Sequence, residues 1–317
     1  MTYAQYGTIQ ATDFNTLAGG NPTTTSGTIN AVWATGGTTA GYGQTAVGNV
    51  TVGTSVAATD WANLVNRTAS AATHQGTSIT SVTAPASGGT ITYLSAIPTN
   101  LTTIYNSRLN AATQGSTTSN SVTFGSTWSN AVTFTHTATF ANGDAARYFF
   151  NSGGQLAITC SHPTGTGINL LLNNMASNVG TVVLSAPTSG SITVVGTSYN
   201  GVTKIGGGYP TGTTISSNNG YYALTTSNAN VFTQTASTGP ASYQSTFIRV
   251  IVKSNGTQGS NGDAGSVITI YTVWDEVPDG LVAATGTNTT LTVRPPETTN
   301  LANSWGTITL TGTASGA

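Results

Sequence analysis

Alternation of hydrophobic and polar positions dominates the second half of the chain. Residues 247–254 (FIRVIVKS) place Ile248, Val250 and Val252 on one side, with Arg249 and Lys253 on the other. This period of two is typical of a strand with one buried and one solvated face. Residues 267–275 repeat the pattern after the Gly-rich stretch 255–265, so we expect the two runs to pair as antiparallel strands.

Strand patterns of this kind follow one another from about residue 165 to the C-terminus, separated by Gly, Asn and Pro. The runs lie at 180–187, 190–202, 245–256, 265–280, 289–297 and 305–313. Strands of about six to ten residues with such spacing predict an antiparallel β-sandwich of the jelly-roll or immunoglobulin-like type. We therefore predict a mainly β protein, with the sandwich at 166–317.

Helical periodicity is limited to the N-terminal third. Residues 59–73 repeat apolar positions at intervals of three and four, and Thr59 is the predicted N-cap. A second helix is predicted from Pro98 to a stop at Gly115. A short turn near 12–17 has Thr12 or Asp13 as its cap.

The stretches between these helices, 27–53 and 77–94, contain many Gly residues and are predicted to form short strands or loops. Residues 1–115 are thus expected to form a small α+β region. Residues 116–165 are expected to form a β-rich junction with one short helix. Within it, residues 132–140 alternate like a half-buried strand, with His136 in phase with the apolar set.

The stretch ANGDAARYFFNSGGQL, at 141–156, gathers charged and aromatic residues between two turns. It predicts a turn at Asn142, a cap from Asp144, and one to two helical turns that end at Gly153. Phe149 or Phe150 is expected to be buried, with Arg147 either exposed or paired with Asp144. We interpret this stretch as a structural junction, consisting of Asp144, Arg147, Tyr148, Phe149, Phe150, Gly153 and Gly154.

Charge is scarce: 7 Lys and Arg residues stand against 8 Asp and Glu residues, so that charged residues form 5% of the chain where about a quarter is usual. The chain thus lacks an electrostatic basis for binding nucleic acid or an anionic membrane. The 5 Trp, 12 Tyr and 8 Phe residues favour a folded chain over a disordered one. No apolar run is long enough to insert in a membrane.

Residue types that perform catalysis are also few. His74, His136 and His162 lack metal-ligand spacing, and Cys160, as the sole cysteine, excludes an intramolecular disulfide and a cysteine zinc cluster. No nucleotide, hydrolase or metalloprotease motif is present. We predict no catalytic residue, no metal, no cofactor and no enzymatic activity.

One acidic group offers an alternative. A glycosidase pair or a cation site could be formed by the carboxylates of Asp275, Glu276 and Asp279, together with that of Asp263. We interpret the first three as a charged turn at a strand end, because adjacent residues of a strand point to opposite faces.

Four tyrosines lie in polar loops: Tyr199, Tyr209, Tyr221 and Tyr222. Exposed aromatic rings in such surroundings can stack on carbohydrate. The same rings can instead anchor loops or fill an oligomer interface, and the sequence leaves both interpretations open.

Residues 1–20 contain neither a basic segment nor an apolar segment of the kind that forms a secretory signal, so we expect a protein made in the cytoplasm. Several short motifs then occur in order, at 9–17, 29–37, 41–45, 60–66, 74–77 and 140–156. Together they resemble virion structural proteins of tailed bacteriophages, of the tail fibre or tail-associated type, notably in phages of cyanobacteria and other aquatic bacteria. The resemblance covers residues 5–160.

The resemblance implies a place in the virion after assembly in the host cytoplasm, commonly as a homotrimer, with no catalysis. The expected function is that of a tail fibre protein that attaches to other tail or baseplate proteins and contributes to recognition of host surface polysaccharide. In such a protein, residues 1–115 would be the region used for attachment or assembly. A head decoration, neck or collar protein is the alternative within the virion, and a glycan-degrading tailspike is the enzymatic one. The resemblance carries no functional residue to this sequence.

Overall fold

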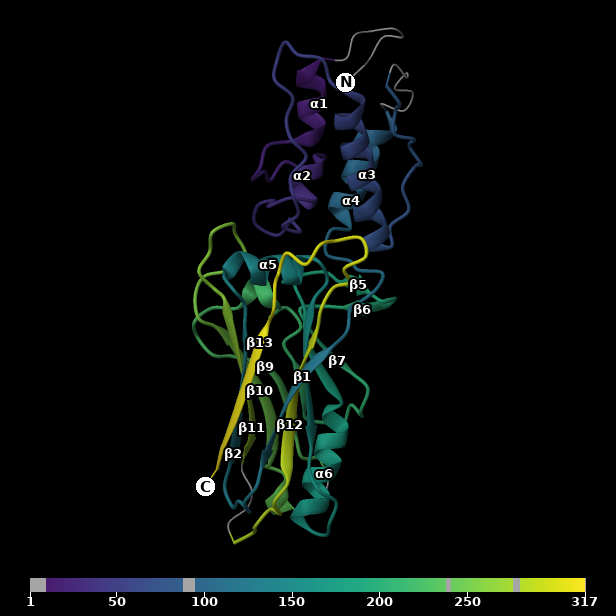
Figure 1. The fold of residues 1–317 in the computed structure, drawn as a ribbon. Coiled ribbons are helices and arrows are strands. Elements are labelled where there is room, and N and C mark those ends of the chain that lie inside the picture. The colour runs from purple at the N-terminus through teal and green to yellow at the C-terminus, as the bar shows by residue number, and fades with distance from the viewer. Residues whose placement is uncertain (1–9, 88–94, 238–240, 276–279, 317) are drawn as a thin grey trace.

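The computed structural model describes residues 10–87, 95–237, 241–275 and 280–316. The four N-terminal helices gather at one end of the molecule, and two sheets whose strands run along its length form most of the rest (Figure 1). The helical region, residues 10–106, contains α1 (Ala11–Ala18), α2 (Ile29–Val32), α3 (Ala58–Gln75) and α4 (Ala96–Asn106). None of the described helices is both long and apolar enough to cross a membrane.

The two large sheets pack as an antiparallel β-sandwich. The first has the order β1 (Thr118–Phe124), β12 (Thr287–Arg294), β3 (Gln155–Ser161), β4 (Thr181–Leu184), β7 (Val202–Ile205). The second has the order β13 (Thr309–Gly316), β2 (Val132–Thr139), β11 (Val267–Asp275), β10 (Phe247–Ser254), β9 (Ala229–Thr235), β8 (Thr213–Ile215). A separate hairpin contains β5 (Ile192–Val194) and β6 (Thr197–Tyr199).

These sheets confirm the prediction of a mainly β protein. The expected pairing of β10 with β11 is present, with Val250 opposite Thr272. Both strands alternate between buried and half-buried residues along their whole length, as the period of two predicted. Strands from 116–165 and from 166–317 share both sheets, and the three-part division of the chain stays a prediction.

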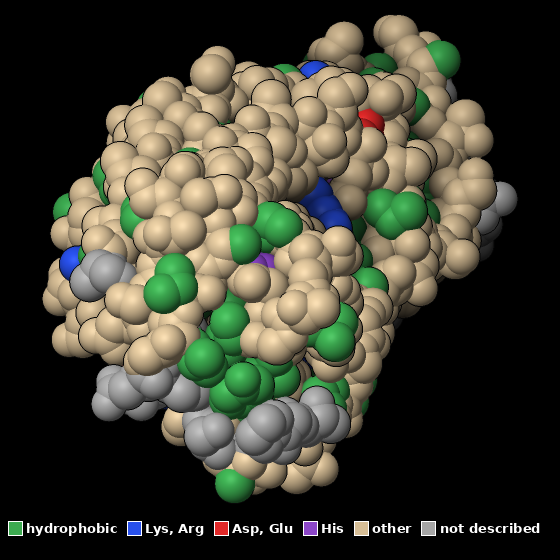
Figure 2. All heavy atoms as spheres, turned by 90° about the horizontal axis from the view of Figure 1, so that it is seen from below, with side chains coloured by type: hydrophobic (Ala, Val, Ile, Leu, Met, Phe, Trp, Pro, Cys, Tyr) green, Lys and Arg blue, Asp and Glu red, His purple; other side chains and the backbone are tan. Residues whose placement is uncertain are grey.

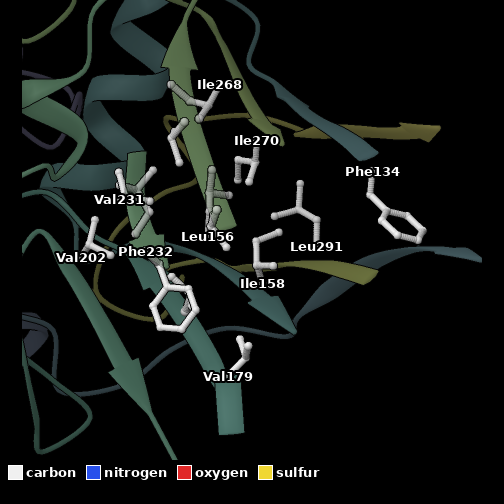
Figure 3. Close-up of a cluster of buried hydrophobic side chains, with 14 of the residues drawn as sticks. Phe134, Leu156, Ile158, Val179, Val202, Val231, Phe232, Ile268, Ile270 and Leu291 are labelled. Carbon is white, nitrogen blue, oxygen red and sulfur yellow. The ribbon is translucent and has the colours of Figure 1, made fainter. Parts of the chain in front are cut away.

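Side chains from the inner faces of both sheets fill one continuous core (Figure 3). α6 (Ile168–Val179) packs against β3, β9 and β10 and adds Leu172 and Val179 to this core. The prediction of strands throughout this part of the chain is wrong for residues 168–179. Their apolar residues recur at intervals of three and four, which suits a helix with one buried side.

Three predicted helix boundaries in this region are wrong. α1 begins after Gln10, whose amide donates to Asp13 Oδ2 at 2.9 Å, so neither Thr12 nor Asp13 is its cap. α3 begins after Ala57, whose amide donates to Asp60 Oδ2 at 2.9 Å, so Thr59 is not the cap. α4 ends at Asn106: the amide of Ser107 still donates to Thr103 O, but the residues beyond it leave the helical pattern. The amides of Ala111 and Ala112 donate to Thr193 O and His74 O instead of continuing the helix to Gly115.

The described part of the helical region contains no strand, so the β component expected there is absent from residues 10–87 and 95–106; residues 88–94 lie outside the description. Side-chain amides replace the strand ladder. Three asparagine side chains each form two hydrogen bonds with the backbone of one distant residue, because they donate to its carbonyl oxygen and accept from its amide. The pairs are Asn15 with Val50, Asn30 with Val47, and Asn100 with Thr80. The loops keep paired backbone groups without forming a sheet.

A strap, residues 295–304, connects β12 to β13 and returns to the helices. Leu301, at 1% exposure, belongs to the helical core together with Phe14, Trp61 and Leu101. Gln44 fixes the strap by donating to Ala302 O and accepting from Ala302 N, both at 2.8 Å. The helical region is thus completed by a segment from the far end of the sequence.

Candidate functional site

The predicted structural junction lies where the helical region meets the sandwich. Asn142 caps α5 (Gly143–Asn151), since its Oδ1 accepts from the amide of Ala145 at 2.8 Å. The expected cap, Asp144, has another role. It forms an ion pair with Arg147, at 2.9 Å between Oδ1 and Nη2, which is one of the two arrangements predicted for Arg147.

Arg147 is fully buried although it is charged. Asp144 Oδ1 accepts from Nε and Nη2, and the carbonyl oxygen of Ala40 accepts from Nη1 at 2.7 Å. The guanidinium also lies over the ring of Tyr148, 4.8 Å from its centre. Because each of these contacts offsets the cost of removing the charge from water, Arg147 binds the sandwich to the helical region.

The loop 39–44 of the helical region runs directly over α5. Asn151 Nδ2 donates to Gly41 O at 3.0 Å. Gly43 has a positive φ of 68°, and a Cβ added there would lie 2.3 Å from the Tyr148 ring. This glycine is therefore required both by the backbone conformation and by the close approach of the loop to α5.

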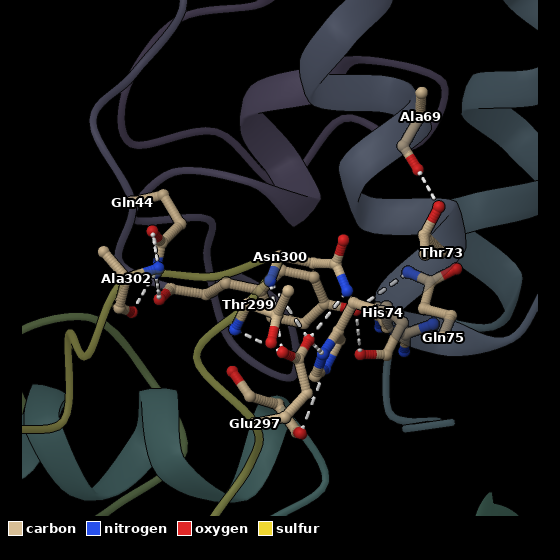
Figure 4. A network of polar contacts seen from close by, with 12 residues as sticks. Gln44, Ala69, Thr73, His74, Gln75, Glu297, Thr299, Asn300 and Ala302 are labelled. Carbon is tan, nitrogen blue, oxygen red and sulfur yellow. Dashed lines mark hydrogen bonds and ion pairs between the residues drawn. The ribbon is translucent and has the colours of Figure 1, made fainter. Parts of the chain in front are cut away.

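His74, at the end of α3, lies between α5 and the strap (Figure 4). Its Nδ1 is 3.2 Å from Glu297 Oε1, and its Nε2 is 3.1 Å from Ser152 O. Burial lowers the pKa of His74, while the hydrogen bond and the charge of Glu297 oppose that shift. Glu297 itself accepts from the side-chain amide of Asn300 and from the backbone amides of Thr299 and Asn300. With the contact to His74, these bonds outweigh burial and lower the pKa of Glu297.

Tyr42 completes this buried network. Its hydroxyl donates to Arg108 O at 2.8 Å and accepts from Gln75 Nε2 at 2.8 Å. Its ring meets that of His74 edge-on, with 5.3 Å between the centres. Burial raises the pKa of Tyr42 well above its usual value, so the hydroxyl stays neutral. These contacts hold the parts in place, and the neutral Tyr42 hydroxyl is not an activated nucleophile.

Aromatic rings form the sandwich side of the junction. Phe149 and Phe150 are both fully buried and contact Phe140 and each other. Tyr221 stacks on Phe150, with centres 4.2 Å apart and planes inclined by 14°. Gly154 follows at a point where an added Cβ would lie 2.6 Å from Phe149 O, and Gly153 has a positive φ of 82°. This part of the predicted junction is a packing centre.

The four loop tyrosines do not form one exposed surface. Tyr199 is buried in β6, Tyr221 is fully buried, and Tyr222 is half-buried with its hydroxyl bonded to Asn151 Oδ1. Tyr209 is 66% exposed. Its ring lies 4.0 Å from Lys204 Nζ, and its hydroxyl donates to Lys204 O. Of the four, only Tyr209 offers a ring to a ligand.

The remaining His residues and Cys160 each have a structural place. His136 joins the sheets, with Nε2 2.8 Å from Thr289 Oγ1 and Nδ1 3.2 Å from Asn120 Oδ1. His162 contacts Thr287 Oγ1 and Asn169 Oδ1. Burial lowers the pKa of His136 to about 4, and burial raises the pKa of Cys160 to about 12. Neither group is poised for proton transfer near neutral pH.

The acidic alternative is only partly described. Asp275 ends β11, whereas Glu276 and Asp279 lie outside the described residues. Asp263 Oδ2 accepts from the amide of Ser260 in the loop 255–265. Among the residues that the structure describes, no three His, Cys, Asp or Glu side chains gather where they could hold a metal ion.

A hollow of about 490 Å³ lies between α3 and residues 77–82. Its lining includes Leu64, Thr68, Ala72, Ile79 and Asn100, and no acidic or basic side chain, His or Cys contributes to it. Such a lining provides shape and hydroxyl groups without an acid or base.

No protein-family model, no curated protein and no solved structure matches this chain. The resemblance to virion structural proteins therefore stays a prediction. The contacts at the junction have a structural role, because buried polar groups fix the helical region to one end of the sandwich.

Proposed function

We propose that the protein is a non-enzymatic structural component of a bacteriophage virion, as a tail fibre protein. The helical region attaches to other tail or baseplate proteins, and the sandwich extends outward and contributes to recognition of host surface polysaccharide. The observation that carries this proposal is the junction. Buried contacts of Arg147, His74 and Gln44 make one long body from two different parts, as a protein needs when it is attached at one end and makes contact at the other.

The surface is compatible with this function. Seen from the sandwich end of the molecule, it consists mostly of backbone and uncharged polar side chains, with a group of hydrophobic side chains and few charged ones (Figure 2). Neutral polysaccharides are bound through hydrogen bonds and ring stacking, which need little charge. Tyr209, beside Lys204, is the group to which we assign ring stacking.

Location in the particle tests the proposal. Antibody raised against the protein should label the tail tip or its fibres in electron micrographs, and should block adsorption to the host. Label on the head or neck would contradict the tail position and favour a decoration or collar protein. Hydrolysis of host polysaccharide by the purified protein would contradict the absence of enzymatic activity.

Tyr209 tests the recognition step separately. We expect Tyr209→Ala to weaken binding to host polysaccharide by about tenfold, because a stacking contact contributes about 1 kcal/mol or more. Tyr209→Phe keeps the ring and should bind nearly as well as the natural protein. Isothermal titration or a glycan array measures both, and equal binding by the Ala variant would exclude Tyr209 from the contact.

A further inference from the structure

The edge strands on the two long sides of the sandwich differ in how they are protected against association with another chain. On one side β7 and β8, the last strands of their sheets, lie near each other. On the other side β1 and β13 lie against each other in the same way. An edge strand leaves a row of unpaired backbone amides and carbonyls, to which another chain can add.

The β7 and β8 side has the protection that natural edges usually carry. β7 has four residues and β8 has three, so that little free edge exists. Lys204 lies in β7, and a register shift between Val250 and Ile251 interrupts the nearby pairing of β10 with β9. Short strands, a Lys and a bulge are all devices that prevent edge-to-edge association.

The β1 and β13 side has none of these devices. β1 has seven residues and β13 has eight, and each pairs with its sheet neighbour through its whole length without a register shift. Neither strand contains Pro, Lys or any other charged residue. No other strand of the described chain pairs with the outer edge of β13.

The two strands that contact β13 are also free of charged side chains. Residues 298–317 contain no Asp, Glu, Lys or Arg, and neither do residues 109–143, which form β1 and β2. A second copy of this chain could therefore approach the edge without repulsion between like charges. The same strip offers no attraction to a strongly charged partner.

The exposed face of β13 is suited to pairing with a second copy of the same strand. Its exposed side chains are Thr309, Thr311, Thr313 and Ser315. In the sheet they continue a row from β2, where Thr137 Oγ1 lies 2.7 Å from Thr311 Oγ1. Residues directly opposite in an antiparallel pair share a face, so pairing with another β13 would extend this hydroxyl surface across two molecules.

The inner face of β13 favours the same arrangement. Gly312 and Gly316 lie so close to β1 that an added Cβ would come within 2.4 Å of Val122 and 2.8 Å of Phe124. β1 thus packs directly beneath the edge. A strand that is already held by packing on one face loses less conformational entropy when a second strand is added.

We propose that β13 is an interface between two copies of this chain, with the two β13 strands paired antiparallel about a two-fold axis. A contact between identical edges is isologous and closes at two molecules. The proposal stands independently of any place in a virion, and it differs from the homotrimer that the resemblance implies. In a pairing that places the exposed Thr side chains of both strands on one face, Thr311 and Thr313 lie near the two-fold axis.

Solution mass of the full chain tests the pairing. The natural protein should sediment with twice the mass of one chain. Thr311→Lys combined with Thr313→Lys places like charges opposite one another at the axis and should raise the dimer dissociation constant at least about tenfold. The matched control, Thr214→Lys with Thr233→Lys, adds the same charge to the β8 edge of the same sheet and should leave the dimer intact.

Hydrogen exchange gives a second readout that needs no variant. In the natural protein, alternate amides of β13 should exchange more slowly at high concentration and lose this protection on dilution. A monomeric natural protein, a trimer, or a dimer that persists in the Thr311→Lys, Thr313→Lys variant would each overturn the proposal. So would β13 amides whose exchange rate does not depend on concentration.

Discussion

The helical region and the sandwich differ in how the backbone of this Gly-rich chain is hydrogen-bonded. The sandwich uses continuous ladders, in which each strand is supported by many bonds of similar strength. The helical region uses single side chains, such as Asn30, which binds both the amide and the carbonyl of Val47. The lesson is that stability is spread over the sandwich but concentrated at a few positions in and around the helical region.

The strongest test of this contrast is Arg147, where the two parts meet. Arg147→Ala removes a buried cation, leaves Asp144 without its partner and frees Ala40 O. We expect the free energy of unfolding to fall by about 3 to 5 kcal/mol, as measured by urea denaturation.

Arg67→Ala is the matched control, because Arg67 is exposed and lies over the ring of Trp33, 5.2 Å from its centre. Its loss should cost no more than about 1 kcal/mol. Similar costs for the two variants would show that the buried contacts of the junction have no special weight.

In the sandwich, the corresponding test is His136, a single side chain whose polar contacts connect the two sheets. Its pKa in the folded protein is about 4, below the value of about 6.5 of an unfolded chain. The unfolded chain therefore binds the proton first, so stability is complete above about pH 6.5 and decreases as the pH falls towards 4. His74, His162 and Glu297 also have lowered pKa values and act in the same direction.

We expect His136 alone to reduce the free energy of unfolding by about 2 to 3 kcal/mol between about pH 7.5 and 4.5. Denaturation at the two pH values measures the total decrease. His136→Gln should remove this share of it while the rest remains. An identical pH dependence in the variant would mean that His136 titrates normally in the fold.

The smallest of these effects compares two asparagines. Asn30→Ala leaves the buried amide and carbonyl of Val47 unpaired and should cost about 2 kcal/mol. Asn288→Ala, on the outer face of β12, removes bonds to the side chains of Ser121 and Thr123, which water can replace. Thermal denaturation should show a loss of about 0.5 kcal/mol or less there. Equal losses would contradict the proposed concentration of stability.

The strands could be predicted from the sequence because burial of one face imposes a period of two on them, as in β2, β10 and β11. Features that depend on distant partners could not be predicted. Asn30 and Val47 are 17 residues apart, and nothing local marks their pairing. α6 begins after Gly167 with no side-chain cap, so only its apolar spacing marked the helix, and that signal was missed among the surrounding strands.

The junction shows the same division. The pair of Asp144 and Arg147 is local, three residues apart, and its formation was one of two predicted arrangements. The burial of Tyr221 depends on Phe150, which is far away in the sequence, so the sequence left open whether this tyrosine is exposed or buried. His74 and Glu297 are 223 residues apart, and no pattern in the sequence connects them.

The strap also sets an order of events during synthesis. α1 to α4 leave the ribosome first, yet their core includes Leu301, which is synthesised after nearly all of the sandwich. At usual rates of translation, Leu301 follows Asn106 by roughly 10 to 40 s. During that interval the helices have an apolar gap where Leu301 will pack, and Gln44 lacks its partner, Ala302. The helical region, which is synthesised before the sandwich, therefore completes its core only after nearly all of the sandwich has been made.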